Sequence, residues 1–168
     1  MADCDVGGGR GMSITLQDAI SLITLEADML DHGDFHDWLK LYTPEGRYVV
    51  PIDPDVEDFE KVLNYAYDDA EMREKRVVRL LSGRSISAAP PARTVRLLSR
   101  YRMLESSDTH CTLRCAQMLQ ELRQGRVHDY AANLNYRLEM TEDGLKIALK
   151  VVRLLISTEA LTAVSYIL

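Results

Sequence analysis

Apolar residues in the first part of the chain recur every three or four positions, which is the spacing of an amphipathic helix. The apolar positions are Leu16, Ile20, Ile23, Ala27 and Leu30. Thr15 followed by Asp18 is typical of a helix N-terminus, and Gly33 is typical of a helix end. The pattern therefore predicts one helix from about residue 15 to about residue 31.

The following stretch alternates short helical and extended patterns. Asp34 can cap a short helix, whose inward side chains are Phe35, Trp38, Leu39 and Tyr42. Residues 46–51 indicate a strand closed by proline, followed by an acidic loop. A third helix is expected from Asp68 or Asp69 to about Leu81, with Gly83 as its C-terminal cap. Its inner face carries Ala70, Val77, Leu80 and Leu81.

The second half of the chain changes to the two-residue period of β-strands. Four extended stretches are expected, at 94–104, 109–123, 128–140 and 145–156, joined by short turns. The third is the clearest, because one face carries His128, Tyr130, Ala132, Leu134, Tyr136, Leu138 and Met140. Four long strands joined by short turns predict an antiparallel meander.

Helices followed by a sheet predict an α+β fold with the helices packed on one face of the sheet. Strands of about 12 residues extend roughly 40 Å and twist strongly. A sheet of that length, curled around helices, becomes a half-open cone. We expect Trp38 to be buried beneath this sheet and the 46–51 strand to complete it.

Length and composition indicate the number of domains, the cellular compartment and the kind of partner. The chain has 168 residues, 46% of them hydrophobic, so we expect a flexible, glycine-rich leader of residues 1–12 and a single domain over residues 13–168. No apolar run reaches the ~18 residues that span a membrane, and three cysteines without tight pairs suit a reducing cytoplasm. The net charge of −6 disfavours nucleic acid or an anionic membrane as the main partner.

Charge is unevenly distributed along the chain. Residues 53–74 contain nine acidic and two basic residues, whereas residues 75–104 contain eight basic residues and no acidic one. Either the two stretches face each other in the fold, or the basic stretch meets an acidic partner protein. Even positions of a strand share a face, so Arg96, Arg100 and Arg102 are expected to point the same way. Together with Arg93 they are candidates for a subunit interface.

The residue types offer little for metal or nucleophilic chemistry. His32 and His36 have helical ligand spacing, but Gly33 lies between them at a helix junction and no third ligand is obvious nearby. Cys111 and Cys115 share a strand face about 13 Å apart, which is too far for both to bind one ion. The sequence contains no nucleophile elbow and no Walker loop.

The chain alone could still perform acid–base catalysis in a pocket inside the cone. The side chains that could line such a pocket are Tyr42, Tyr48, His110, Asp34 and Tyr136. The ordinary alternative for each tyrosine is a buried ring whose hydroxyl finds a hydrogen-bond partner.

Several short segments form an ordered set along most of the chain. They are Asp34–Leu39 with Leu41–Thr43 and Gly46–Pro51, Tyr67–Asp69 opening a helix that ends Arg76–Leu80, Pro90–Thr94, and Ala163–Leu168. In this order and spacing they resemble the small (β) subunit of aromatic-ring-hydroxylating dioxygenases. Two positions depart from the family pattern, since Ala92 replaces a serine and Leu97 stands where a histidine is expected.

The resemblance implies a cystatin-like or NTF2-like cone and a mainly structural role. Members of this family usually assemble with a large subunit as α3β3 hexamers, and the large subunit carries the Rieske 2Fe-2S cluster and the mononuclear iron. The resemblance therefore implies no catalytic, cofactor-binding or metal-binding residue on this chain. It implies as partners a large dioxygenase subunit and copies of the chain itself, in an α3β3 complex or a homotrimer.

Two other functions stay open. One is a stand-alone NTF2-like isomerase or dehydratase, which needs a wide cavity with an acid–base pair in reach. The other is a small-ligand-binding domain, which needs the cavity alone. A dioxygenase subunit is expected to have a filled cone and a large apolar or basic patch on its outer surface.

Overall fold

The computed structural model describes residues 13–86, 92–155 and 167–168. The predicted leader of residues 1–12 and the prolines at 90–91 lie outside these residues. The helices are α1 (Leu16–His32), α2 (Phe35–Leu39) and α3 (Ala70–Ile86), with a 3₁₀ turn at Phe59–Lys61. The strands are β1 (Tyr42–Pro51), β2 (Asn64–Asp68), β3 (Arg93–Ser106), β4 (His110–Arg123), β5 (Arg126–Thr141) and β6 (Gly144–Leu154).

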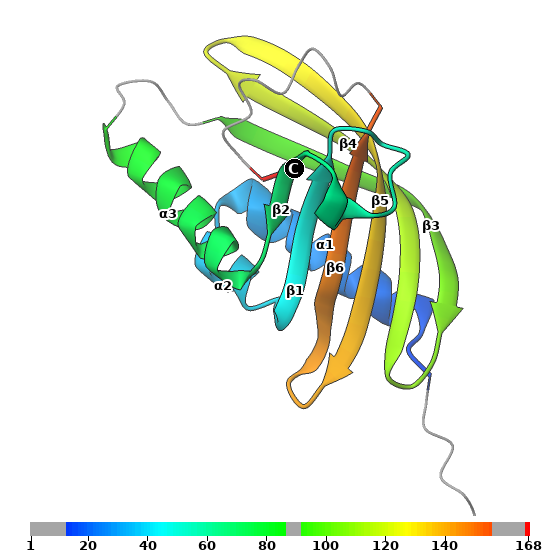
Figure 1. Cartoon of the computed structure of the whole chain (residues 1–168). Helices are drawn as coiled ribbons and strands as arrows, with labels where there is room; N and C mark the ends of the chain where they lie inside the picture. The colour runs from blue at the N-terminus through cyan, green and yellow to red at the C-terminus, as the bar shows by residue number, and fades with distance from the viewer. Residues whose placement is uncertain (1–12, 87–91, 156–166) are drawn as a thin grey trace, which may run out of the picture.

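The strands form one curved sheet in the order β2-β1-β6-β5-β4-β3. Figure 1 shows α1 lying across one side of this sheet, while α2 and α3 lie beside β1 and β2. The predicted α+β cone is therefore confirmed. The sheet was expected to be antiparallel throughout, but β1 pairs with β6 in parallel, and only the other pairs are antiparallel.

Helix α1 begins and ends where the sequence predicts. Thr15 and Asp18 form a reciprocal capping box, and Gly33 ends the helix with a left-handed φ of 79°. The buried face differs from the expected one, because its members are Ala19, Leu22, Ile23, Glu26 and Leu30. A charged residue thus occupies a position within the apolar stripe, and the spacing of apolar residues alone does not reveal it.

Around the short helix α2, burial follows the prediction. Trp38 is fully buried, as expected, and Phe35 and Tyr42 are buried with it. Asp34 precedes α2, but its side chain makes no capping hydrogen bond.

Two features between β1 and β3 differ from expectation. The stretch predicted as an acidic loop contains β2, a short edge strand paired antiparallel with β1. Helix α3 continues through Gly83 to Ile86, so its predicted end near Leu81 is wrong. A glycine inside a helix costs only about 1 kcal/mol relative to alanine, which the remaining helix can offset.

A β-bulge divides β3 into two parts with opposite orientation. Arg100 has a left-handed φ of 56°, and the register with β4 shifts between Ser99 and Arg102. Before the bulge the even position Arg96 is buried, whereas after it the odd positions Tyr101 and Met103 turn inward. One extra residue moves all later side chains to the other face. The prediction that Arg96, Arg100 and Arg102 point the same way is therefore wrong.

The β4–β6 region follows the sequence pattern closely. Ala132, Leu134, Tyr136 and Leu138 of β5 are buried, while both ends of that strand are exposed. The turns at Gln124–Gly125 and at Gly144 have the positive φ values expected of tight hairpins. No helix among the described residues is both long and apolar enough to cross a membrane.

Candidate functional site

A buried carboxylate lies at the centre of the cone. Glu26 of α1 accepts four hydrogen bonds, from Trp38 Nε1 (3.0 Å), Tyr42 OH (3.2 Å), Lys150 Nζ (3.1 Å) and Tyr136 OH (2.8 Å). Glu26 and Lys150 are each 1% exposed. We call these five residues the Glu26 network. It joins α1, α2, β1, β5 and β6 through one side chain.

Aromatic rings surround the ion pair. The Trp38 ring meets Tyr42 and Tyr48 edge to face, with centroids 5.3 Å and 6.3 Å away. The Lys150 ammonium lies 5.7 Å from the Tyr48 ring and 5.8 Å from the Tyr136 ring. These contacts stabilise a cation in the interior in addition to the Glu26 carboxylate.

Burial fixes the proton positions in the network. It raises the pKa of Tyr42 and of Tyr136 well above the ordinary value, with the Glu26 carboxylate adding to the effect. Burial also lowers the pKa of Lys150, and the neighbouring Glu26 opposes this shift. At neutral pH the two tyrosines are hydrogen-bond donors and stay protonated. The network therefore has the form of a closed, satisfied structural cluster.

The structure brings together three of the five pocket candidates. Tyr42 and Tyr136 donate to Glu26, and the Tyr48 ring lies beside Lys150, with each of the three hydroxyls hydrogen-bonded. His110 lies elsewhere, at the start of β4, within 3.3 Å of Glu105 Oε1, and Asp34 is exposed. The expected acid–base grouping of all five residues does not form.

Glu26 and Lys150 were not among the sequence candidates. Each stands within an apolar run, Glu26 between Leu22 and Leu30 on one helix face and Lys150 between Leu149 and Val151. A charge at a predicted core position requires a partner, and this was the signal available in the sequence.

A second buried ion pair lies between α1 and β3. Asp31 accepts hydrogen bonds from Thr94 Oγ1 (2.8 Å), from the Arg96 main-chain nitrogen (2.7 Å) and from the Arg96 guanidinium. The Arg96 side chain is 2% exposed. Arg96 was an interface candidate, but it lies inside the chain because the β3 positions before the bulge alternate into the core. Its partner is Asp31, outside the acidic 53–74 stretch.

The other three interface candidates are exposed on β3. Arg93 and Arg102 point to solvent, and Arg100 donates a hydrogen bond of 2.6 Å to Asn133 Oδ1 of β5. Beside them lies an outer apolar patch on β3, β4 and β5. Its members are Val95, Leu97, Met118, Leu122 and Val127, each between 41% and 65% exposed.

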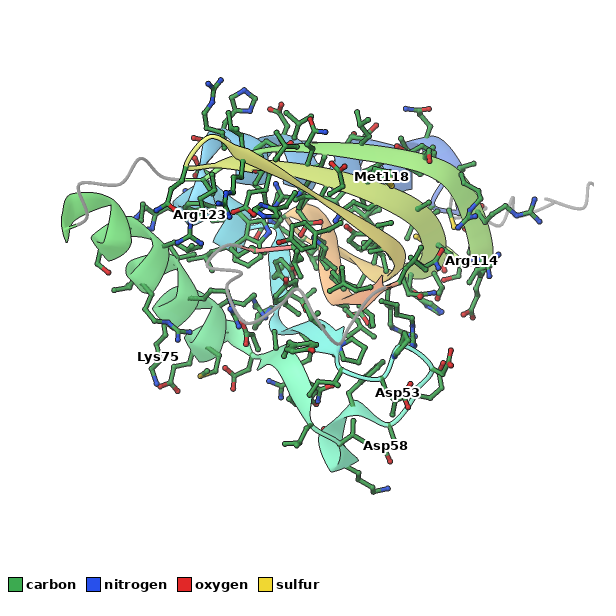
Figure 2. The ribbon with its side chains drawn as sticks, turned by 90° about the horizontal axis from the view of Figure 1, so that it is seen from above. Asp53, Asp58, Lys75, Arg114, Met118 and Arg123 are labelled. Carbon is green, nitrogen blue, oxygen red and sulfur yellow. The ribbon has the colours of Figure 1, made fainter. Side chains whose placement is uncertain are left out.

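Strand register makes this patch continuous. Leu97 is opposite Met118, Arg93 is opposite Leu122, and Leu122 is opposite Val127. Figure 2 labels Met118 on β4, on the side of the molecule away from Asp53 and Asp58. The sheet thus carries an apolar and basic outer surface far from the acidic segment between β1 and β2.

Among the described residues, ion pairs between the acidic and basic stretches occur only near α3. Arg76 makes two hydrogen bonds to the Asp68 carboxylate, at 2.5 and 3.0 Å, and Lys75 pairs with Glu71 at 2.5 Å. The β3 arginines lie at the opposite edge of the sheet from β2. Local neutralisation therefore applies to α3, and the exposed β3 arginines stay available to a partner.

An open cleft of about 670 Å³ lies between α2, β1, α3 and the β5–β6 turn. Its lining includes Tyr42, Arg73, Glu142 and Lys146, but not Glu26 or Lys150. The Arg73 guanidinium lies 4.2 Å from the Tyr42 ring centroid. The cleft therefore does not open onto the buried ion pair.

Candidate metal ligands remain separate in the described residues, where no group of three His, Cys, Asp or Glu side chains could hold an ion. His32 pairs with Asp28 on the surface. Cys111 and Cys115 are both buried, as expected, and burial raises the pKa of the Cys115 thiol to about 12. A thiol held protonated is a poor metal ligand.

Several known proteins are similar to this chain in sequence. A family model described as ring hydroxylating beta subunit matches residues 25–159. The small oxygenase component of the p-cumate 2,3-dioxygenase system of Pseudomonas putida is 30% identical over 150 residues, covering 88% of this chain and 82% of that protein. The 2-halobenzoate 1,2-dioxygenase small subunit of Burkholderia cepacia is 30% identical, covering 77% and 82%.

Solved structures share the fold. The beta subunit of the benzoate 1,2-dioxygenase from Burkholderia mallei aligns with a TM-score of 0.73 and 23% identity, covering 84% of this chain and 91% of that one. A naphthalene 1,2-dioxygenase chain gives 0.76 and 18% identity, covering 91% and 85%. An NTF2-like protein with a cystatin-like fold from Novosphingobium aromaticivorans gives 0.60 and 15%, covering 86% and 83%. The expected cystatin-like, NTF2-like fold is confirmed.

Proposed function

This chain belongs to the ring hydroxylating beta subunit family, and from that membership we propose that it is the small subunit of a Rieske-type aromatic-ring-hydroxylating dioxygenase. In this role it supports the assembly of a large catalytic subunit and carries no catalytic residue itself. The observation that carries the proposal is the family match over residues 25–159, which runs from α1 past the end of β6.

The interior geometry supports a structural role. A catalytic group must touch its substrate, yet Glu26 and Lys150 are 1% exposed and their hydrogen bonds go to neighbours within the chain. A stand-alone isomerase would need such a pair at the wall of a cavity. The similarities to dioxygenase small subunits favour the subunit over this alternative and over a ligand-binding domain.

The redox groups are assigned to the large subunit. The donor set described here fits neither a Rieske cluster nor a mononuclear iron, since it has no group of three ligands and Cys115 is held as a thiol. The large subunit would hold both groups and select the substrate. The names of the relatives mention p-cumate and 2-halobenzoate, which supports an aromatic ring as the substrate of the complex.

The outer face of β3 and β4 is the surface assigned to assembly. It combines the outer apolar patch with Arg93, Arg100 and Arg102, and a surface of this composition suits a protein partner with acidic groups at its rim. The complex is proposed to be α3β3, with a homotrimer when the chain is alone. Its place is the cytoplasm, which suits the free, buried cysteines.

Co-expression with a large dioxygenase subunit from the same source organism tests the proposal. The large subunit carries an affinity tag, this chain does not, and the purified material is analysed by mass and by iron content. We expect this chain to co-purify in equal amount and all iron to remain with the large subunit after the two are separated. Recovery of the large subunit alone, or iron that stays with this chain, would contradict the proposal.

A further inference from the structure

Two residues that follow the last strand in the sequence are buried inside the cone. Ile167 and Leu168 are 1% and 3% exposed and belong to the hydrophobic core. The end of the chain is marked C in Figure 1.

Three polar side chains from three different strands contact the main chain of these two residues. Arg96 of β3 donates to the Ile167 main-chain oxygen. Lys150 of β6 donates to the Leu168 main-chain oxygen at 3.1 Å. The Leu168 main-chain nitrogen donates to the Tyr48 hydroxyl of β1 at 2.9 Å. We call Tyr48, Arg96 and Lys150 the clasp.

Each member of the clasp is held in place by another group. Asp31 fixes the Arg96 guanidinium, Glu26 fixes the Lys150 ammonium, and the Trp38 ring packs edge to face against Tyr48. All three members are more than nine-tenths buried. Donors and an acceptor held in fixed positions form a pre-organised site for peptide groups.

The chemistry of the clasp defines what it accepts. The clasp hydrogen-bonds one main-chain N–H and two main-chain oxygens, and it makes no polar contact to the side chains of Ile167 or Leu168. Those side chains are packed in the apolar core. Removal of the segment would leave two buried cations with fewer acceptors, which is costly in an apolar interior.

We propose that the clasp is a binding site for a two-residue aliphatic peptide segment, and that Ile167–Leu168 fill it in cis. The cone is then closed by its own chain, and the space is denied to a small ligand. This inference goes beyond the subunit function and does not depend on it, because the site lies entirely within this chain.

Emptying the site in the full-length chain tests the inference. The variant carries Ile167→Asp and Leu168→Asp, and the matched control carries Leu155→Asp at a position that is 67% exposed. The probe is the N-acetylated peptide Ala-Val-Ser-Tyr-Ile-Leu, and the comparison peptide ends in Asp-Asp. The fluorescence of Trp38, the single tryptophan, reports binding, because its ring lies 6.3 Å from that of Tyr48.

We expect the emptied variant to bind the probe saturably and at least tenfold more tightly than the comparison peptide. Adding Lys150→Met should weaken probe binding at least tenfold. The wild type and the Leu155→Asp control should show no saturable binding at the same concentrations, because their sites are filled. Equal binding of both peptides, or no binding by a folded variant, would overturn the inference.

A second measurement needs no emptied variant. Hydrogen exchange of the Leu168 amide in the wild-type chain should be at least 100-fold slower than in a free peptide. Tyr48→Phe should accelerate it at least tenfold, while the Leu155 amide, which donates to the Ala131 carbonyl, keeps its rate. Exchange of the wild-type Leu168 amide at the free-peptide rate would overturn the inference, even if the aspartate variant failed to fold.

Discussion

The interior of the cone and the outer face of β3 use charged residues in opposite ways. Inside, Glu26 and Asp31 each collect several donors, and the cations that pair with them are almost fully buried. Outside, the side chains of Arg93 and Arg102 make no hydrogen bond or ion pair within the described part of the chain, and they lie next to exposed apolar side chains. The interior charges therefore serve the fold, and the exterior ones are available for association.

One strand contains both kinds of position. Arg96 and Arg102 are six residues apart in β3, and a shared face would be expected from their even spacing. The bulge at Arg100 reverses the alternation, so Arg96 enters the core and Arg102 leaves it. Residue type alone therefore does not assign a role to an arginine in this chain, because the local register decides it.

The largest effect is expected from breaking the buried ion pair. Lys150→Met leaves the Glu26 carboxylate buried without its cation, which should lower the free energy of unfolding by about 3–5 kcal/mol. Urea denaturation followed by Trp38 fluorescence measures this loss.

The paired variant separates the charge from the packing. Glu26→Gln together with Lys150→Met removes both charges but keeps an acceptor oxygen for the tyrosine donors. At least half of the lost stability should return, because replacing a buried pair by neutral groups of similar size is often close to neutral. A double variant as unstable as Lys150→Met alone would show that lost packing causes the effect.

A smaller effect, still large, is expected at Arg96. Arg96→Met removes the guanidinium hydrogen bonds to Asp31 and to the Ile167 oxygen, and should cost about 2–4 kcal/mol. Arg102→Met makes the same chemical change at an exposed position of the same strand, and should stay within about 0.5 kcal/mol of the wild type. Equal losses in thermal or urea unfolding would remove the contrast between the two regions.

Alkaline pH should weaken the interior selectively. The Cys115 thiol titrates near 12 in the folded chain, against an ordinary value of 9.0. Between pH 9 and 12 the folded state keeps this proton while the unfolded state loses it, so stability falls as the pH rises through that window, by up to about 1.4 kcal/mol per pH unit. Unfolding curves at pH 8 and pH 10 should show a loss about 1 kcal/mol smaller in Cys115→Ala than in the wild type. An identical loss of stability in the wild type and in Cys115→Ala would contradict the raised pKa of the Cys115 thiol.

The smallest effect on stability is expected from the exterior arginines. Arg100→Glu with Arg102→Glu should change the free energy of unfolding of the isolated chain by less than about 1 kcal/mol, since both side chains are exposed. The same variant should bind the large subunit at least tenfold more weakly, measured by co-purification or by calorimetry. A normal complex would show that these arginines have no role in assembly, and an unfolded variant would show that they stabilise the isolated chain instead.

Local signals in the sequence predicted much of the fold. The capping pair Thr15 and Asp18, the glycines at 33, 125 and 144, and the alternation along β5 each depend on neighbours in sequence, and the structure confirms them. The same local signals predicted the burial of Trp38, which the structure also confirms.

Long-range effects explain what the sequence did not predict. The parallel pairing of β1 with β6 joins residues about a hundred positions apart, which no local period reports. The bulge at Arg100 has no glycine or asparagine to mark it. Glu26 and Lys150 were overlooked because a charged residue becomes a core residue only when distant partners surround it, here Trp38 and Tyr136.

The central claim is that the interior of this chain serves structure and takes no part in catalysis. The most direct test is the Glu26→Gln, Lys150→Met double variant, assembled with the large subunit and assayed for product formed per large subunit. We expect the complex to form and its product yield to stay within twofold of the wild-type complex. A complex that assembles at the wild-type level but forms product at least tenfold more slowly would contradict the account.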